Sequence, residues 1–158
     1  MIRTGILEEI RRAAARAPDG TRRPAAAVLT CVDERVVPEA ALGCGQGRLY
    51  CVRLAGHVVT GEVVGSLEIA LGLGCGLVFV LGHTDCGAVR LERERTGDCF
   101  SIVQHIRWAV RMLPWEADLG QAVEANVRHS VAELRYRLQA RIEGGVLDLA
   151  TGQVRVLS

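Results

Sequence analysis

The stretch Leu-Val-Phe-Val-Leu-Gly-His-Thr-Asp-Cys-Gly, residues 77–87, decides the fold of this chain. Its first five residues form a continuous apolar run, which is typical of a parallel strand covered on both faces. The polar segment from His83 to Gly87 therefore follows a buried strand and leads into a helix. A second stretch, residues 25–35, repeats the arrangement, because the run AAAVLT precedes Cys31-Val32-Asp33-Glu34-Arg35.

The remaining apolar patterns place strands and helices in alternation along the chain. Apolar runs predict strands at residues 25–30, 49–53 and 77–81, whereas helical spacing predicts helices at 4–17, 60–73, 101–113 and 119–142, with one or two helical turns at 38–43. Gly144-Gly145 is predicted to end the last helix, and the runs VLDLA and QVRVL around Thr151-Gly152 predict a terminal hairpin. This order predicts an α/β fold: a single domain, residues 1–158, with a mostly parallel sheet flanked by helices and a C-terminal hairpin.

Composition narrows the class of protein. The chain has 158 residues, of which 49% are hydrophobic and 23% charged, with a net charge of +1, so it has the balance of one globular domain. Basic residues are spread along the chain among acidic ones, and we expect no nucleic-acid partner. No apolar run is long enough to cross a bilayer, and we expect no membrane partner.

Residues 1–20 predict an amphipathic N-terminal helix rich in charge. They contain no apolar core of a secretory signal, so we expect a cytoplasmic protein. Ile6, Leu7, Ile10 and Ala14 share one face of the helix. We expect a partner subunit to cover apolar surface that this helix and the short sheet leave, which makes residues 1–20 a candidate dimer arm.

Cys31, His83 and Cys86 form a candidate metal site. The carboxyl ends of parallel strands meet at one edge of a sheet, so the two motifs converge if their strands are neighbours. Two thiolates and one imidazole leave one position of a tetrahedral zinc ion open, as in catalytic zinc sites. Two alternatives remain: a buried cysteine with a helix-capping Asp85 and a surface histidine, or a structural zinc closed by a fourth ligand.

Four further cysteines lie outside the two motifs. Cys51 and Cys75 have apolar neighbours and are predicted to be buried, whereas Cys44 and Cys99 are predicted to lie in loops. We interpret all four as inert thiols, although Cys44 or Cys99 would supply the fourth ligand of a structural zinc site.

The segments CVDERV, RLAGHVVT, GSLEIA and LGHTDCGAV and the terminal Thr-Gly hairpin resemble, in this order, the β-class carbonic anhydrases. The resemblance extends from about Ala25 to the C-terminus. It implies a Zn2+ enzyme that hydrates carbon dioxide to bicarbonate, built as a homodimer or higher even oligomer with the active site near the dimer interface. By resemblance, the metal ligands are Cys31, His83 and Cys86, and the catalytic residues are Asp33 and Arg35.

The chemistry of the two catalytic candidates agrees with this resemblance. Zinc lowers the pKa of bound water to about 7, and Asp33 would orient the resulting hydroxide toward carbon dioxide. The planar guanidinium of Arg35 would hold the Asp33 carboxylate away from the metal. Two states follow: Asp33 paired to Arg35, or Asp33 on zinc with the enzyme inactive. The plain alternative is a loop salt bridge without a catalytic part.

The segment RLAGH departs from the family pattern, which has Asn at the position of Leu54 and Asn or Gly at that of His57. We consider His57 either a solvated loop residue or a group for proton transfer. Arg53 is expected to stabilise the loop after its own strand.

Two residues of the second motif are candidates for supporting roles. Asp85 is expected to cap the following helix or to orient a ligand. Gly87 is expected to allow close backbone approach after Cys86, with its N–H facing a bound anion.

Two alternative functions remain open. Carbonyl sulfide and carbon disulfide are small linear molecules that the same zinc ligands would hydrolyse. A catalytically silent zinc domain used for assembly is the other alternative, although it would have no need of Asp33 and Arg35.

Overall fold

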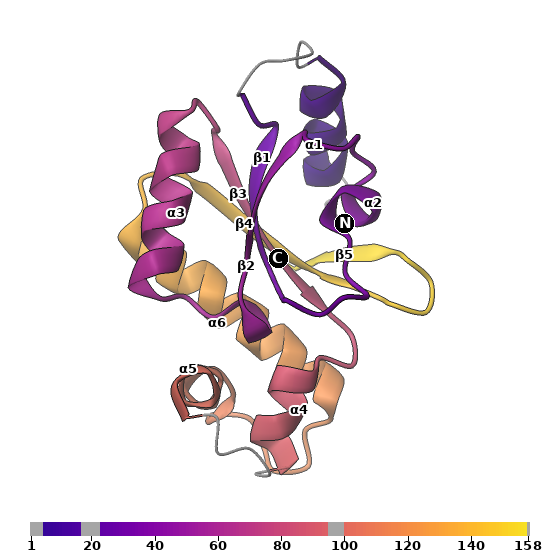
Figure 1. Ribbon diagram of the computed structural model, residues 1–158. Helices are drawn as coiled ribbons and strands as arrows, with labels where there is room; N and C mark the ends of the chain where they lie inside the picture. The colour runs from indigo at the N-terminus through magenta and orange to yellow at the C-terminus, as the bar shows by residue number, and fades with distance from the viewer. Residues whose placement is uncertain (1–4, 17–22, 95–99, 158) are drawn as a thin grey trace.

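The computed structural model describes residues 5–16, 23–94 and 100–157, which form one five-stranded sheet with helices on both faces (Figure 1). The strands are β1 (Ala26–Thr30), β2 (Leu49–Arg53), β3 (Leu77–His83), β4 (Arg141–Leu147) and β5 (Val154–Leu157). The helices are α1 (Gly5–Arg16), α2 (Pro38–Leu42), the 3-10 turn η1 (Ala55–His57), α3 (Gly61–Gly72), α4 (Gly87–Glu94), α5 (Phe100–Val110) and α6 (Leu119–Arg137). The predicted α/β class and the terminal hairpin are confirmed. None of the described helices has the length and apolar character needed to cross a membrane.

The strand order is β2-β1-β3-β4-β5, with only β5 antiparallel to its neighbour. Side chains alternate across the sheet, so each strand contributes to two separate apolar clusters. In β1, Ala27 and Leu29 pack with residues of α3 and α6, whereas Ala26 and Val28 pack with residues of α1 and α2. Figure 1 shows the same division, with α1 and α2 on one side of the sheet and α3 and α6 on the other.

The apolar face of α1 is covered within its own chain. Ile6, Leu7 and Ile10 are buried in the cluster that includes Val28 and Phe79 of the sheet. Because these side chains are already removed from water, any apolar surface left for a partner subunit lies elsewhere than on this face. The role of residues 1–20 as a dimer arm stays a prediction, and residues 1–4 and 17–20 lie outside the described part of the chain.

The predicted helix over residues 119–142 is too long at its C-terminal end. Helix α6 ends at Arg137, and Gly144-Gly145 lies inside β4 instead of ending the helix. Close packing explains the two glycines: a Cβ on Gly144 would lie 2.8 Å from Val131 Cγ2 of α6, and one on Gly145 would lie 3.0 Å from Phe79 Cζ. The pair therefore lets α6 approach one face of β4 and β3 side chains approach the other.

Replacing Gly144 by Ala is expected to lower the free energy of unfolding by about 1–3 kcal/mol, because the added methyl group overpacks the α6–β4 contact. Urea denaturation followed by circular dichroism measures the change. Gly65→Ala in α3 is the matched control, since its Cβ meets no atom within 4 Å, and we expect unchanged or slightly higher stability. An unchanged midpoint for Gly144→Ala would contradict the packing argument.

The sheet order brings the two sequence motifs together. β1 and β3 are direct parallel neighbours, with Thr30 opposite Leu81. Cys31 therefore leaves the sheet beside the end of β3, which carries His83. Cys31 and His83, which are 52 positions apart in the sequence, thus share one edge of the sheet, as the two motifs predict.

Candidate metal centre

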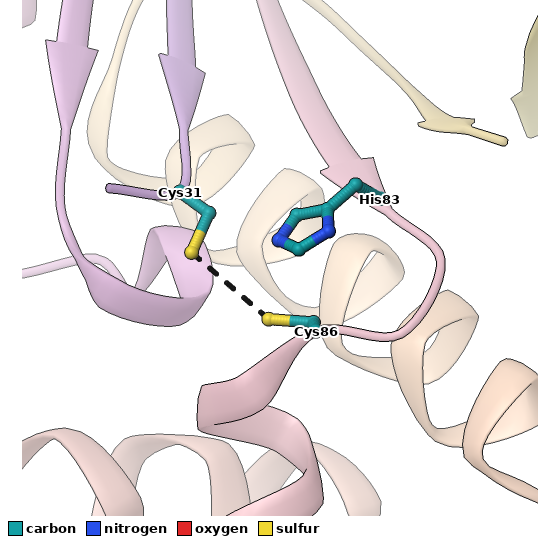
Figure 2. A group of neighbouring side chains, drawn as sticks. All are labelled: Cys31, His83 and Cys86. Carbon is teal, nitrogen blue, oxygen red and sulfur yellow. Dashed lines mark hydrogen bonds between the residues drawn. The ribbon is translucent and has the colours of Figure 1, made fainter. Parts of the chain in front are cut away.

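Three ligand side chains converge at the carboxyl edge of the sheet (Figure 2). Cys31 follows β1, His83 ends β3, and Cys86 directly precedes α4. The sulfur atoms of Cys31 and Cys86 lie 4.0 Å apart, and all three potential ligand atoms lie within 4.8 Å of one another. All three residues are buried. Burial of three such groups in one place contradicts the alternative of a surface histidine beside an inert cysteine.

The imidazole of His83 is oriented for a metal. Its Nδ1–H donates to the carbonyl oxygen of Thr84 at 2.9 Å, which leaves the lone pair on Nε2. Nε2 is buried and has no hydrogen-bond partner among the described residues. Thr84 is itself anchored, because its N–H donates to Leu147 O and its Oγ1 accepts from Leu149 N. An orphaned, well-oriented nitrogen beside two thiols is what a metal ligand requires.

The two cysteines do not have equal environments. The pKa of Cys31 is lowered well below its usual range, chiefly by the hydrogen bond with Cys86, and the N–H of Gly56, whose nitrogen is 3.3 Å from Sγ, acts in the same direction. The pKa of Cys86 is raised by its hydrogen bond with Cys31 and by burial. The N–H of Gly56 favours negative charge on Cys31, and a bound cation would favour the thiolate form of both cysteines.

The donor set fits zinc. Two sulfurs that each lie about 2.3 Å from one ion must be within roughly 4.6 Å of each other, and the observed separation satisfies this limit. Within the described residues, the cluster contains only Cys31, His83 and Cys86, and Cys44 packs instead with the α1–α2 cluster. A structural site closed by Cys44 is therefore wrong, while Cys99 lies outside the described residues.

Asp33 and Arg35 form a bidentate ion pair beside this cluster. Arg35 Nη2 lies 2.7 Å from Asp33 Oδ2, while Nε and the backbone N–H donate to Oδ1 at 2.9 and 3.0 Å. These hydrogen bonds from Arg35 lower the pKa of Asp33 to about 2. Asp33 Oδ2 is 3.8 Å from His83 Nε2. The Asp33 carboxylate is therefore held by Arg35 next to the ligand cluster.

Asp85 holds Arg35 from the other side. Arg35 Nη1 lies 3.1 Å from Asp85 Oδ2, and Nη2 also donates to the Asp85 carbonyl oxygen at 3.1 Å. Arg90 of α4 pairs with the remaining oxygen of Asp85. Asp85 thus orients the catalytic candidate Arg35, and among the described residues its carboxylate accepts no hydrogen bond from a ligand or from a backbone N–H at the start of α4.

Replacing Arg35 by Gln is expected to flatten the acid dependence of stability. Because the pKa of Asp33 is lowered from 3.8 to about 2 in the fold, its stabilising effect is present above pH 4 and is lost as the pH falls toward 2. Urea denaturation between about pH 2 and pH 5 measures this loss in both proteins. Arg137→Gln, which removes an exposed pair with Glu133 on α6, is the control and is expected to keep the wild-type slope.

His57 is buried, with 1% of its surface exposed, so the alternative of a solvated loop residue is wrong. Burial lowers its pKa to about 4, which keeps the ring neutral at pH 7. Its Nδ1 lies 3.3 Å from Ser130 Oγ, and its Nε2 lies 3.5 Å from Asn126 Nδ2. Proton transfer by His57 stays a prediction, and a neutral ring with both nitrogens engaged favours a positioning role.

Three expectations for the surrounding loops need correction. A Cβ on Gly87 would meet no atom within 4 Å, so the described residues show no close backbone approach there. Arg53 donates to the carbonyl oxygens of Cys31 and Asp33, so it stabilises the loop after β1 instead of the loop after its own strand. Cys51 is exposed because β2 is an edge strand, whereas Cys75 is buried as predicted.

Sequence reasoning missed Arg90, Asn126 and Ser130. Arg90 lies one turn after Cys86 on α4, where its charge reaches Asp85. Asn126 and Ser130 are buried on α6, among the valines that face the sheet. Two polar residues four positions apart on an otherwise apolar face were the signal, because buried polar groups require partners.

The site consists of a buried Cys–His–Cys cluster that can hold a metal, beside a carboxylate paired with an arginine. Its position at the carboxyl edge of a parallel sheet is typical of an α/β metalloenzyme. The family model of carbonic anhydrase matches residues 26–154. The chain belongs to the β-carbonic anhydrase family.

Individual comparisons agree with this assignment. A carbonic anhydrase of Mycolicibacterium smegmatis is 34% identical over 134 residues, which are 78% of this chain and 65% of that protein. The chain thus spans slightly less than two-thirds of that relative. A carbon disulfide hydrolase of Saccharolobus solfataricus is 39% identical over 74 residues, 46% of this chain and 36% of that protein. The structure of a Coccomyxa β-carbonic anhydrase has the same fold, with a TM-score of 0.73 at 23% identity over 87% of this chain and 73% of that one.

Proposed function

We propose that this chain is a zinc-dependent carbonic anhydrase that reversibly hydrates carbon dioxide to bicarbonate and a proton. The observation that carries the proposal is the Asp33–Arg35 pair beside the buried cluster of Cys31, His83 and Cys86. A site that served only the fold would not need a carboxylate held next to the ligands by a bidentate guanidinium. Membership of the carbonic anhydrase family supports the reaction.

The residues of the site have separate roles in this proposal. Two thiolates and one imidazole hold zinc, which supplies hydroxide at neutral pH by lowering the pKa of water. Asp33 remains ionised because its pKa is about 2, so its oxygens accept hydrogen bonds at every physiological pH. Arg35 donates hydrogen bonds to both oxygens of the Asp33 carboxylate and so keeps it from turning toward the metal. Oδ2, the oxygen nearer to His83, is thus placed to orient the attacking oxygen.

An even oligomer, most simply a homodimer, is part of the proposal. Val32 and Val37 flank the Asp33–Arg35 pair, and each is 53% exposed, so an apolar surface lies beside the site. Exposed apolar surface next to a functional site supports a protein interface there. Size-exclusion chromatography with light scattering tests this, and a monomer at micromolar concentration would contradict it.

A cytoplasmic location is also part of the proposal. The five described cysteines are all free, which is typical of proteins in a reducing compartment.

Stopped-flow hydration of carbon dioxide by purified protein with a quantified zinc content tests the main proposal. Fast hydration that rises with zinc occupancy would support it. Full zinc occupancy without hydration at any pH would overturn it.

Hydrolysis of carbon disulfide or carbonyl sulfide is the second candidate. The similarity to a carbon disulfide hydrolase over 74 residues favours it, because the same ligands serve any small linear substrate of this kind. Sulfide release from carbon disulfide and from carbonyl sulfide, measured on the preparation used for carbon dioxide hydration, distinguishes hydrolysis from hydration. A zinc-loaded protein inactive on all three substrates would instead support a silent zinc domain used for assembly.

A further inference from the structure

A buried polar network lies behind the metal-ligand cluster and connects it to α6. It consists of His57 in η1 and of Asn126 and Ser130 on α6, each of them at most 2% exposed. Asn126 and Ser130 are one helical turn apart, so their side chains project from the same face of α6. Burying three adjacent polar side chains destabilises a core unless each of them has hydrogen-bond partners.

The two helix residues hold the backbone of η1. Asn126 Nδ2 donates to the carbonyl oxygen of Gly56 at 2.8 Å, and Ser130 Oγ donates to that of His57 at 3.2 Å. Both backbone residues are buried, so these bonds satisfy acceptors that water does not reach. Two consecutive carbonyl groups of the turn are therefore fixed by one helix.

The turn needs this support because its backbone is unusual. Gly56 has φ 62° and His57 has φ 44°, and the left-handed region is unfavourable for a residue with a side chain. The ring of His57 fills the space over Gly82, where a Cβ would lie 3.2 Å from Nε2. His57 Nδ1–H donates to Ser130 Oγ, and Nε2 accepts from Asn126, so the ring completes the connection between turn and helix.

The turn in return directs one hydrogen bond at the metal site. The backbone nitrogen of Gly56 lies 3.3 Å from Cys31 Sγ, and its N–H donates to that sulfur. We propose that Asn126 and Ser130 are positioning residues which, through the Gly56–His57 turn, hold this N–H on Cys31 and thereby set how strongly the Cys31 sulfur donates electrons to the metal. The inference rests on the proposed zinc site, and it adds to that proposal the residues that tune one ligand. Hydrogen bonds to a metal-bound sulfur act on both the affinity and the electronic properties of a metal site.

Cobalt substitution tests the proposal directly, because the thiolate-to-cobalt charge-transfer band reports the electron density on sulfur. In Asn126→Leu and in Ser130→Ala, we expect the band to move to lower energy than in the wild type. We also expect zinc affinity, measured by competition with a chromophoric chelator, to fall about 10- to 100-fold in Asn126→Leu and by less in Ser130→Ala. Neither readout depends on the hydration of carbon dioxide.

Val131→Ala is the matched control. Val131 is next to Ser130 on α6, but its side chain packs against Gly144 of β4 and has no polar atom to join the network. We expect this variant to lower the melting temperature while the cobalt band and the zinc affinity stay as in the wild type. A shift of the band in Val131→Ala as large as in Asn126→Leu would overturn the proposal, because core loosening alone would then explain it.

The remaining outcomes separate this inference from the proposed function. An unchanged band and affinity in both folded network variants overturn the inference while the function stands. If Asn126→Leu does not fold, Ser130→Ala decides alone, since it removes only one hydroxyl group. A wild-type protein that binds neither cobalt nor zinc would overturn the proposed function, and the inference with it.

Discussion

Replacing Asp33 by Asn is expected to lower carbon dioxide hydration by roughly 10²- to 10⁴-fold while zinc stays bound, a loss of the size that removing a positioned acid–base group causes. The amide has nearly the same shape as the carboxylate, but it carries no negative charge and presents N–H donors. The donors of Arg35, which are 2.7–3.0 Å from the two carboxylate oxygens, would keep only one oxygen acceptor on residue 33. Zinc is retained because Asp33 is not part of the ligand cluster.

Stopped-flow hydration and zinc analysis of the same preparation measure both parts of this prediction. Glu34→Gln is the control, because Glu34 is an exposed carboxylate next to Asp33 that has no place in the pair. It is expected to keep wild-type activity. Wild-type activity in zinc-loaded Asp33→Asn would mean that the Asp33–Arg35 pair is only a salt bridge of the loop.

Replacing Cys31 by Ser is expected to abolish zinc retention and hydration together. A serine hydroxyl stays protonated at neutral pH and cannot replace a thiolate as a zinc ligand. After dialysis against a weak chelator, the zinc content is expected to fall from about one ion per chain to nearly none. The stabilisation of the fold by added zinc, about 2.7 kcal/mol when free zinc is 100 times Kd, is expected to disappear as well.

Cys75→Ser provides a closely matched control for this variant. Cys75 and Cys31 are 5% and 4% exposed, but Cys75 Sγ donates to the carbonyl oxygen of Leu77 in the core, outside the metal cluster. A serine hydroxyl can make the same bond, so the control is expected to keep both zinc and activity. Equal zinc loss in the two variants would show that damage to the core, and not removal of a ligand, explains the result.

Much of the site could be predicted from the sequence because each ligand directly follows a local signal. The apolar runs before Cys31 and His83 end where the polar motifs begin, and the register of β1 and β3 confirms that they are neighbours. The ligand pattern also required Cys86 near the start of a helix, and α4 begins at the next residue. Local order along the chain therefore placed each ligand at or just after the end of a strand, and the pairing of β1 with β3 brought the three together.

Other features could not be predicted because they depend on contacts between distant segments. The sequence pattern predicts that the last helix continues to residue 142. Residues 141–147 instead form β4, because they pair with β3. The exposure of Cys51 depends on the position of β2 at the edge of the sheet. Neither the strand order nor the pairing partner is encoded in a short window of sequence.

The sequence by itself determined the α/β class, the three candidate ligands and the Asp33–Arg35 pair, because each depends on residue type and on short-range spacing. Only the tertiary structure decided that His57 is buried, that Asp85 holds Arg35 and is itself paired with Arg90, and that α6 supports the turn whose N–H contacts Cys31. The reason is that burial and hydrogen-bond partners are set by packing between elements far apart in the chain.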